Sequence, residues 1–309
     1  MHKSPCNQKP NIGLSIIFPS WNRRQDTLDY LGSIKQSPFP QGQIEIIMID
    51  NHSQDGTVKL VQQHYPKVKI IGLDKNYGPA YARNRGIEKA QGELIFCSDN
   101  DQTLTTNTLP ILANHLQTNP EVGVVGAKVV SKTKPHQIIS CGYTWNRWLG
   151  TECGLKNCGR VKECDWIAGC SMMFKKSLVD KIGLFDEKFF FFGEDADFCL
   201  RAKKAGYKVV SLPNAIVYHG KSKSPRAKRV GPKNSQSQIP ENSDFSKDYY
   251  DYYKAKFRLI LKHSNLPQKI ISISLHLTFF SLLRYLAKKK ENIVLKVKAF
   301  SEALRNIEQ

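Results

Sequence analysis

The chain has 309 residues and a formal net charge of +19 at pH 7, from 46 Lys and Arg against 27 Asp and Glu. An apolar fraction of 40% and a charged fraction of 24% are ordinary for a globular protein, and they exclude collagen, wholesale disorder and a small disulfide scaffold. A polytopic membrane protein is excluded because no clean run of about 18 apolar residues occurs. The length predicts two domains, or one large domain with an appendage.

The N-terminal residues contain no apolar segment of the kind found in a secretory signal, so we expect a cytoplasmic protein with reduced thiols. Cys97 and Cys199 lie in apolar stretches and are expected to be buried. Cys153, Cys158 and Cys164 are close in sequence, but they form no CxxC pair. Whether these three cysteines bind zinc is left open by their spacing.

Strands and helices alternate along the first part of the chain. Four short apolar runs, mostly rich in β-branched residues, predict strands buried on both faces: Leu14–Phe18, Ile44–Ile49, Lys69–Leu73 and Leu94–Cys97. The segments 25–36, 57–65 and 79–91 between them are expected to be helices. This order predicts a mostly parallel α/β sheet, in which ligands bind beyond the carboxyl ends of the strands.

The rest of the chain changes character twice. A helix is predicted from Asp195 to Ala205, with Asp197 and Arg201 paired on its exposed face. The polar and basic segment 221–244 is expected to be a mobile loop. Beyond it, an amphipathic helix is predicted from Ile293, whereas the start of the apolar stretch Ile270–Ala287 leaves helix and strand open.

The final part of the chain is also strongly basic. Residues 220–309 contain 19 Lys and Arg against 7 Asp and Glu, which calls for an anionic partner such as phospholipid, nucleic acid or a phosphorylated substrate. Tyrosines between positions 249 and 253 are of a type that favours a membrane interface. The alternative is a helical subdomain packed on the core with a solvated basic face. A membrane span over Ile270–Ala287 is disfavoured by His276 and Arg284.

Acidic residues follow the strand that ends near Cys97. Asp99 and Asp101, two positions apart in a turn, can converge on one Mg²⁺ or Mn²⁺ ion, although a solvated acidic turn is the alternative. His219, after another apolar run, can add an imidazole ligand or be purely structural.

Two further segments suit a nucleotide. Asp50 and Asn51 end the second predicted strand and can bind a base or ribose, or form an Asx turn and helix cap. The small residues from Asn76 to Gly86 open a helix whose N-terminus suits phosphate, and Arg83 within it can contact a diphosphate. Close packing of this helix on the sheet explains the small residues equally well.

Glu194 and Asp195 follow an aromatic run, Phe189–Phe192, at the start of a predicted helix. A carboxylate beside apolar walls is a candidate general base. An N-cap pair is the alternative interpretation.

Six segments in this order resemble the family 2 glycosyltransferases of the nucleotide-diphospho-sugar transferase (GT-A) fold: PSWNR, IDNHSQDGT, NYGPAYARNRG, SDND, GEDADFCLRAKKAGY and YHGKSKS. The resemblance runs from Leu14 to His219, and the most similar subgroup contains bacterial rhamnosyltransferases. It implies a GT-A domain at 11–220, which we expect to lie between a tail at 1–10 and, after the loop, a basic C-terminal helical region at 245–309 that can lie on a membrane surface. The insert 145–164 has no obvious counterpart in the family.

The resemblance also implies roles for individual residues. Asp195 is expected to be the general base, with Glu194 beside it on the acceptor side. Asp101 is the expected main metal ligand, with Asp99 and His219 near the ion. Expected contacts to the nucleotide sugar are Pro19, Ser20, Asn22, Arg23, Asp50, Asn51, Asn76, Gly78, Arg83, Asp99, Trp166 and Gly169.

The function expected from the resemblance is inverting transfer of a hexosyl or deoxyhexosyl group, with Mn²⁺ or Mg²⁺ as cofactor. The donor is a UDP-, TDP- or GDP-linked sugar, and the acceptor is a hydroxyl of a glycan or lipid-linked saccharide in cell-surface polysaccharide assembly. The enzyme is then expected on the inner face of the membrane. A sugar nucleotidyltransferase and a non-catalytic basic protein that binds nucleic acid or lipid are the alternatives, although no nucleic-acid motif occurs and no such partner is expected.

Overall fold

The computed structural model describes residues 12–39, 42–155, 158–220, 245–279, 281 and 293–305. The tail expected at 1–10 and the loop expected at 221–244 lie outside these residues.

The first half of the central sheet is parallel. Strand β1 (Ile12–Ser20) lies between β2 (Gln43–Asp50) and β4 (Leu94–Ser98), and β3 (Lys69–Gly72) pairs with β2. All four predicted strands are confirmed. In the register of this sheet Ser20 lies opposite Asp50, so the polar residues that follow β1 and β2 leave the sheet at one edge.

The second half of the sheet is mixed. Strand β11 (Ser171–Lys175) runs antiparallel between β4 and β6 (Val122–Ser131), and β12 (Lys208–His219) is parallel to β6. The short strands β5 (Gln102–Leu104), β7 (Ile138–Ser140) and β10 (Lys162–Glu163) pair at its margins. Because β5 pairs with β12, His219 lies opposite Gln102, next to the acidic turn after β4.

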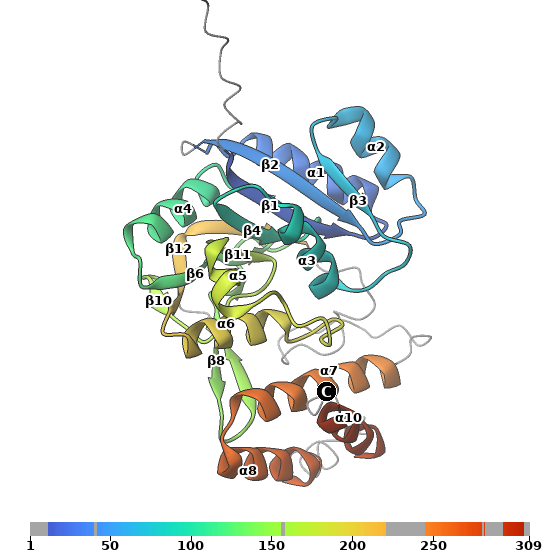
Figure 1. Cartoon of the computed structure of the whole chain (residues 1–309), viewed down its shortest axis with the longest axis vertical. Coiled ribbons are helices and arrows are strands. Elements are labelled where there is room, and N and C mark those ends of the chain that lie inside the picture. The colour runs from blue at the N-terminus through green and yellow to red at the C-terminus, as the bar shows by residue number, and fades with distance from the viewer. Residues whose placement is uncertain are drawn as a thin grey trace, which may run out of the picture.

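Helices cover both faces of the sheet (Figure 1). Helices α1 (Arg24–Lys35), α2 (Thr57–His64) and α4 (Thr108–Thr118) contribute to one apolar core. Helices α3 (Pro79–Lys89), α5 (Ser177–Ile182) and α6 (Glu194–Lys204) contribute to the other. The architecture is the predicted α/β fold, a mostly parallel sheet flanked by helices.

A helical layer follows the α/β domain. Helices α7 (Phe245–His263) and α8 (Leu266–Leu277) lie beside the hairpin of β8 (Tyr143–Asn146) and β9 (Thr151–Gly154), and α10 (Ile293–Arg305) packs against α7 (Figure 1). The ambiguous apolar stretch is therefore helical at its start, and the predicted amphipathic helix is α10. No helix in the described part of the chain is long and apolar enough to cross a bilayer.

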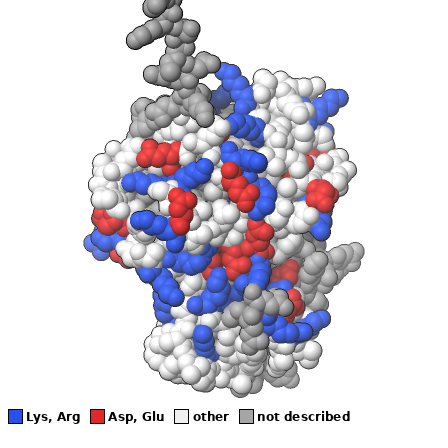
Figure 2. Space-filling model, in the orientation of Figure 1, with Lys and Arg blue, Asp and Glu red and all other residues white. Residues whose placement is uncertain are grey.

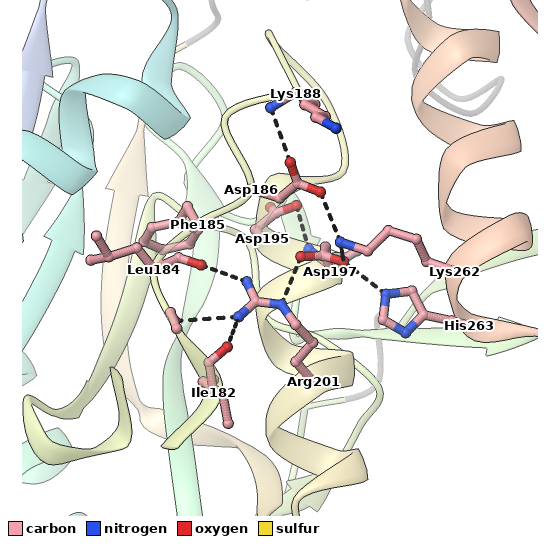
Figure 3. A network of polar contacts seen from close by, with 12 residues as sticks. Ile182, Leu184, Phe185, Asp186, Lys188, Asp195, Asp197, Arg201, Lys262 and His263 are labelled. Atoms are coloured by element: carbon pink, nitrogen blue, oxygen red, sulfur yellow. Dashed lines mark hydrogen bonds and ion pairs between the residues drawn. The ribbon is translucent and has the colours of Figure 1, made fainter. Parts of the chain in front are cut away.

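Two expectations about the C-terminal region need correction. Tyr249 and Tyr253 are buried within the helical layer, so these two tyrosines are not available to a membrane interface. Asp197 and Arg201 do pair, with Nε 2.8 Å from Oδ2, but the Asp197 side chain is fully buried instead of exposed. It is covered because α7 packs against α6 and supplies Lys262 and His263 to the same carboxylate (Figure 3).

The cysteines also differ from expectation in part. Cys97 and Cys199 are buried, as predicted. Cys141 and Cys158 form a disulfide, which corrects the expectation that all thiols are reduced. Cys158 is paired with Cys141, so it is not free to bind zinc together with the exposed Cys153 and the buried Cys164.

Candidate active site

The loops that leave β1 and β2 are bound to each other. The Asn51 amide donates to the Ser20 carbonyl at 2.7 Å, and the Asn22 Oδ1 accepts from the Gln54 amide at 2.7 Å. Asn22 has φ 47° and Arg23 has φ 112°, both in the left-handed region that non-glycine residues rarely adopt. Such backbone strain persists where surrounding contacts fix it, and it is concentrated at functional sites.

Asp50 presents one unused oxygen in this region. Its Oδ2 accepts from the Ser53 amide at 3.0 Å, as the predicted Asx turn requires. Its Oδ1 is buried without a hydrogen-bond partner among the described residues. An unpaired buried acceptor is costly, so an N–H donor of a ligand would be bound favourably there. Pro19 precedes this pair of loops at the end of β1.

Gly78 lies at the start of α3, where the backbone comes close to another loop. It has φ +85°, and a Cβ built there would lie 2.2 Å from the Phe190 carbonyl oxygen. Asn76 Oδ1 accepts from the Gly78 amide at 2.9 Å, and Asn51 Oδ1 from the Tyr77 amide at 3.3 Å. The glycine is therefore explained by close packing against the loop that leads into α6.

The acidic turn after β4 is held by cations. His219 Nε2 lies 3.3 Å from Asp101 Oδ1 and 3.6 Å from Asp99 Oδ2, and Arg23 Nη1 lies 3.0 Å from Asp101 Oδ2. Burial alone lowers the pKa of His219, but the two carboxylates outweigh it and raise that pKa to about 9. A charged imidazolium between two carboxylates indicates that this position strongly favours positive charge.

The residues present fit a divalent cation. Carboxylate oxygens and an imidazole nitrogen are donors that Mn²⁺ and Mg²⁺ sites use. One ligand atom each from Asp99, Cys170 and His219 lie within 4.8 Å of one another. Burial raises the pKa of the Cys170 thiol well above its usual value, which makes it a poor ligand for a hard ion. His219 lies within 3.6 Å of both carboxylates, so the set expected from the sequence, Asp99, Asp101 and His219, stays the prediction for such an ion.

Arg83 joins the acidic turn to the start of α6. Its side chain is 3% exposed, with Nη2 2.9 Å from Asp99 Oδ1 and Nη1 2.8 Å from Glu194 Oε1. Burial and the charge of Asp195 raise the pKa of Glu194 to about 8, against the influence of Arg83. Both terminal nitrogens of Arg83 contact carboxylates, and its contact to a diphosphate stays a prediction.

Asp195 is oriented by two backbone donors. Its Oδ2 accepts from the Gly169 amide at 2.9 Å, and its Oδ1 accepts from the Ala196 amide at 2.8 Å. Burial raises the pKa of Asp195. A Cβ on Gly169 would lie 2.8 Å from Arg83 Nη1, so only glycine lets this segment approach Asp195 and Arg83 together. A fixed carboxylate with a raised pKa has the properties of a general base.

A cavity of about 190 Å³ opens beside Asp195. Trp166, a predicted site residue, stacks on Tyr143 with ring centroids 5.2 Å apart and planes at 7°. The sequence did not point to the other residues that line this cavity, among which are Tyr143, Trp145, Glu152, Tyr252 and Lys256. The two tryptophans of the insert at 145 and 148, and the alternation of Tyr with Lys near 253, were the available indications.

The chain is similar in sequence to known glycosyltransferases. The model of glycosyl transferase family 2 matches residues 15–183, and a model described as the N-terminal domain of galactosyltransferase matches residues 150–223. An N-acetylglucosaminyltransferase of Rhizobium meliloti is 24% identical over 226 residues, which cover 69% of this chain and 52% of that protein. An N-acetylglucosaminyl-diphospho-decaprenol L-rhamnosyltransferase of Mycobacterium tuberculosis is 23% identical over 209 residues, covering 59% and 68%. The chain thus spans about half the length of the first relative.

Two solved structures have a fold similar to that of this chain. The S. aureus TarS 1–349 complex with UDP has a TM-score of 0.54 at 18% identity, covering 89% of this chain and 73% of that one. GalNAc-T7 with UDP, GalNAc and Mn²⁺ has a TM-score of 0.64 at 14% identity, covering 97% and 57%. At these identities the likeness shows the GT-A fold alone. Because the family model matches more than half of the chain, the protein belongs to glycosyltransferase family 2.

Proposed function

We propose that this glycosyltransferase moves a sugar from a nucleotide diphosphate sugar to an acceptor hydroxyl, with inversion at the anomeric carbon. The observation that carries the proposal is Asp195, which backbone amides orient toward a cavity and whose pKa burial raises. On its other side Glu194 and Arg83 connect it to the acidic turn. The base is therefore close to both a candidate acceptor cavity and a candidate cation site.

The nucleotide is proposed to bind between the loops after β1 and β2. The unpartnered Asp50 Oδ1 suits a ring N–H of a nucleobase, as the uracil of UDP provides. Two structural neighbours are complexes with UDP, which supports a UDP-linked donor over TDP and GDP. Relatives named for N-acetylglucosaminyl and rhamnosyl transfer leave both hexosyl and deoxyhexosyl donors in the proposal.

Asp99, Asp101 and His219 would hold Mn²⁺ or Mg²⁺, in place of the proton that His219 now carries between the two carboxylates. When bound, the ion offsets the negative charge that develops on the leaving diphosphate. Arg23 and Arg83 already hold positive charge at the same turn, on Asp101 and Asp99. The chain thus supplies part of this charge itself.

The chemical step proposed for Asp195 is a single displacement. The carboxylate accepts the proton of the acceptor hydroxyl as that oxygen bonds to the anomeric carbon, and the bond from the anomeric carbon to the diphosphate oxygen breaks on the opposite face. The products are an inverted glycoside and a nucleoside diphosphate. Glu194 stays with Arg83 and keeps the start of α6 in position.

Asp195→Asn tests this assignment. The variant keeps the acceptor oxygen of the side chain but loses the base, so transfer should fall about 10²–10⁴-fold while the Kd for UDP stays within about twofold. Nucleoside diphosphate release and product mass are the measurements. Asp180→Asn, at an exposed position on α5, is the matched control and should behave as wild type. Undiminished transfer by Asp195→Asn would exclude Asp195 as the base, and release of inorganic diphosphate would indicate a nucleotidyltransferase.

The acceptor is proposed to be carried at an anionic membrane surface. The outer face of α8 exposes Leu266, Ile270 and Ile271, and this end of the molecule is largely uncharged in Figure 2. In the sequence, Arg284 and Lys288 to Lys290 lie between α8 and α10. Apolar side chains with neighbouring basic residues suit the interface of an anionic bilayer. Flotation with phosphatidylglycerol vesicles should recover the protein, whereas Ile270→Asp should reduce recovery; equal recovery of both would remove the claim.

A further inference from the structure

Two walls of the cavity beside Asp195 come from elements outside the central sheet. One wall is the hairpin β8–β9, and another is α7, which supplies Tyr252 and Lys256. Helix α7 begins beyond residue 223, where the family matches end. The wall that α7 supplies therefore lies outside the residues that the family models match, whereas the hairpin lies within them.

The cavity is lined by aromatic rings and by one polar cluster of Glu152, Tyr252 and Lys256. Trp145 meets Trp166 edge-on, with ring centroids 6.0 Å apart. Lys256 Nζ lies 3.0 Å from Glu152 Oε2, and the Tyr252 hydroxyl donates to Glu152 Oε1 at 2.6 Å. Lys256 is 8% exposed, whereas the Glu152 side chain is 27% exposed, so the pair is only partly shielded from water. Because the two charges balance, the polar cluster offers hydrogen bonds without a net charge.

Trp145 provides an independent indication of a ligand. The residue is 7% exposed, and its Nε1 is buried with no hydrogen-bond partner among the described residues. Buried indole N–H groups usually find an acceptor, because an unmet donor costs the free energy of its lost hydration. Trp145 also lines the cavity, so a ligand bound there is a candidate source of the missing acceptor.

We propose that the cavity binds one neutral pyranose ring, the sugar residue of the acceptor that is extended; this rests on the proposed transfer reaction. A pyranose has apolar C–H faces that pack on aromatic rings and hydroxyl groups that both donate and accept. Trp145 Nε1 donates to one ring oxygen, and the Glu152–Lys256 pair binds further hydroxyls. Another hydroxyl then meets Asp195.

Size and charge disfavour other occupants. At about 190 Å³ the cavity is smaller than the roughly 300–1,000 Å³ of pockets for drug-sized ligands, so it suits one ring. A phosphate would need an unbalanced cation, but Lys256 is paired with Glu152. An aliphatic chain would leave Trp145 Nε1 unsatisfied.

The test uses the full chain, UDP-sugars as donors and p-nitrophenyl pyranosides of glucose, galactose, mannose, rhamnose and N-acetylglucosamine as acceptors. At least one pyranoside should be extended by a sugar. Trp145→Phe keeps a ring but removes the N–H, and Glu152→Gln removes a charge. Each should raise the acceptor KM about tenfold or more and leave the donor KM within about twofold. Glu302→Gln, which breaks the Lys254–Glu302 pair between α7 and α10, is the control and should leave both KM values as in wild type.

Other outcomes would overturn the inference. It fails if the variants raise the donor KM instead, or if only acceptors without a pyranose, such as polyprenyl phosphate or an alditol phosphate, are extended. Each variant is checked by thermal unfolding, and Tyr252→Phe is a milder replacement if Glu152→Gln does not fold. The effective sugar is then compared as a soluble glycoside and on a polyprenyl diphosphate, which separates a glycan end from a lipid-linked acceptor.

A turnover-free measurement keeps this inference distinct from the proposed function. Saturation-transfer NMR records binding of the pyranosides to wild type and Trp145→Phe without a donor. Binding that Trp145→Phe loses, in a protein that releases no nucleoside diphosphate from any donor, would overturn transfer while upholding a pyranose site. Turnover without pyranoside binding would overturn the site alone.

Discussion

Asp197→Asn is the sharpest test of how the helical layer is attached to the α/β domain. The Asp197 carboxylate is fully buried and contacts the cations Arg201, with Nε at 2.8 Å, and Lys262, with Nζ at 2.6 Å, and also the His263 ring, with Nε2 at 2.8 Å. Figure 3 shows these groups converging from α6 and α7. An Asn side chain has nearly the same shape, so the substitution removes charge with little change in packing.

The expected loss of folding stability depends on which contacts Lys262 and Arg201 keep after the substitution. Removing one partner of a buried ion pair costs about 3–5 kcal/mol, because the remaining charge is left uncompensated. Lys262 keeps Asp186 at 2.8 Å, and Arg201 keeps the Leu184 carbonyl at 2.8 Å, so neither is stranded. We therefore expect the lower end of this range, about 3 kcal/mol at pH 7, in urea unfolding.

The loss should depend on pH with a definite sign. Burial alone raises the pKa of Asp197, but His263, Arg201 and Lys262 outweigh it and hold that pKa far below its usual value. A carboxylate with a depressed folded-state pKa contributes stability above its unfolded pKa of about 3.9 and loses it as the pH falls toward the folded value. The gap between wild type and Asp197→Asn should therefore narrow from pH 7 to pH 3.

The Asp197→Asn prediction has a matched control at an exposed aspartate. Asp180→Asn, exposed on α5, should lie within about 0.5 kcal/mol of wild type at pH 7. If Asp197→Asn also lies within that margin, or if its deficit is unchanged at pH 3, the ion-pair network does not hold α7 on α6.

Two further changes test the core and the thiols. Gly86→Ala places a Cβ 2.4 Å from Ile17 Cγ2 and 2.8 Å from Ile49 Cδ1, so overpacking should lower stability by about 1–3 kcal/mol in thermal unfolding; a stabilised variant, as helix propensity alone predicts, would contradict this. Alkylation with iodoacetamide in denaturant without reductant should modify two fewer than the eight cysteines, because Cys141 and Cys158 are paired. Modification of all eight would restore the expectation of reduced thiols.

Much of the sheet could be predicted from sequence because its strands are buried on both faces. Apolar runs such as Leu14–Phe18 and Ile44–Ile49 are typical of such strands, and the rule that ligands bind at carboxyl ends directed attention to Asp50 and Asp99. Parallel neighbours then bring these residues to one edge. Local pattern and global topology pointed to the same residues.

The residues of the proposed acceptor cavity could not be predicted in this way. Glu152 and Lys256 are about a hundred residues apart, and they meet only because α7 lies beside the hairpin. A helix pattern shows an apolar stripe, but not which part of the protein covers it. The same limit explains Asp197: the spacing to Arg201 predicted the pair, whereas its burial depends on α7.

The start of α6 is held from two sides, and this arrangement suggests that the choice of acceptor is coupled to the support of the proposed base. On the side of the sheet, Arg83 connects Glu194 to the acidic turn through contacts of 2.8 and 2.9 Å. On the other side, Lys262 and His263 of α7 contact Asp197, which lies two residues after the proposed base Asp195 in α6. The same helix α7 supplies Lys256 to the cavity. A change in α7 should therefore alter the proposed acceptor cavity and the support of the proposed base together, whereas the proposed donor contacts at the strand ends lie on other elements. Substitutions that reshape the cavity should accordingly be better tolerated on the hairpin β8–β9, which carries no contact to Asp197 among those described, than on α7.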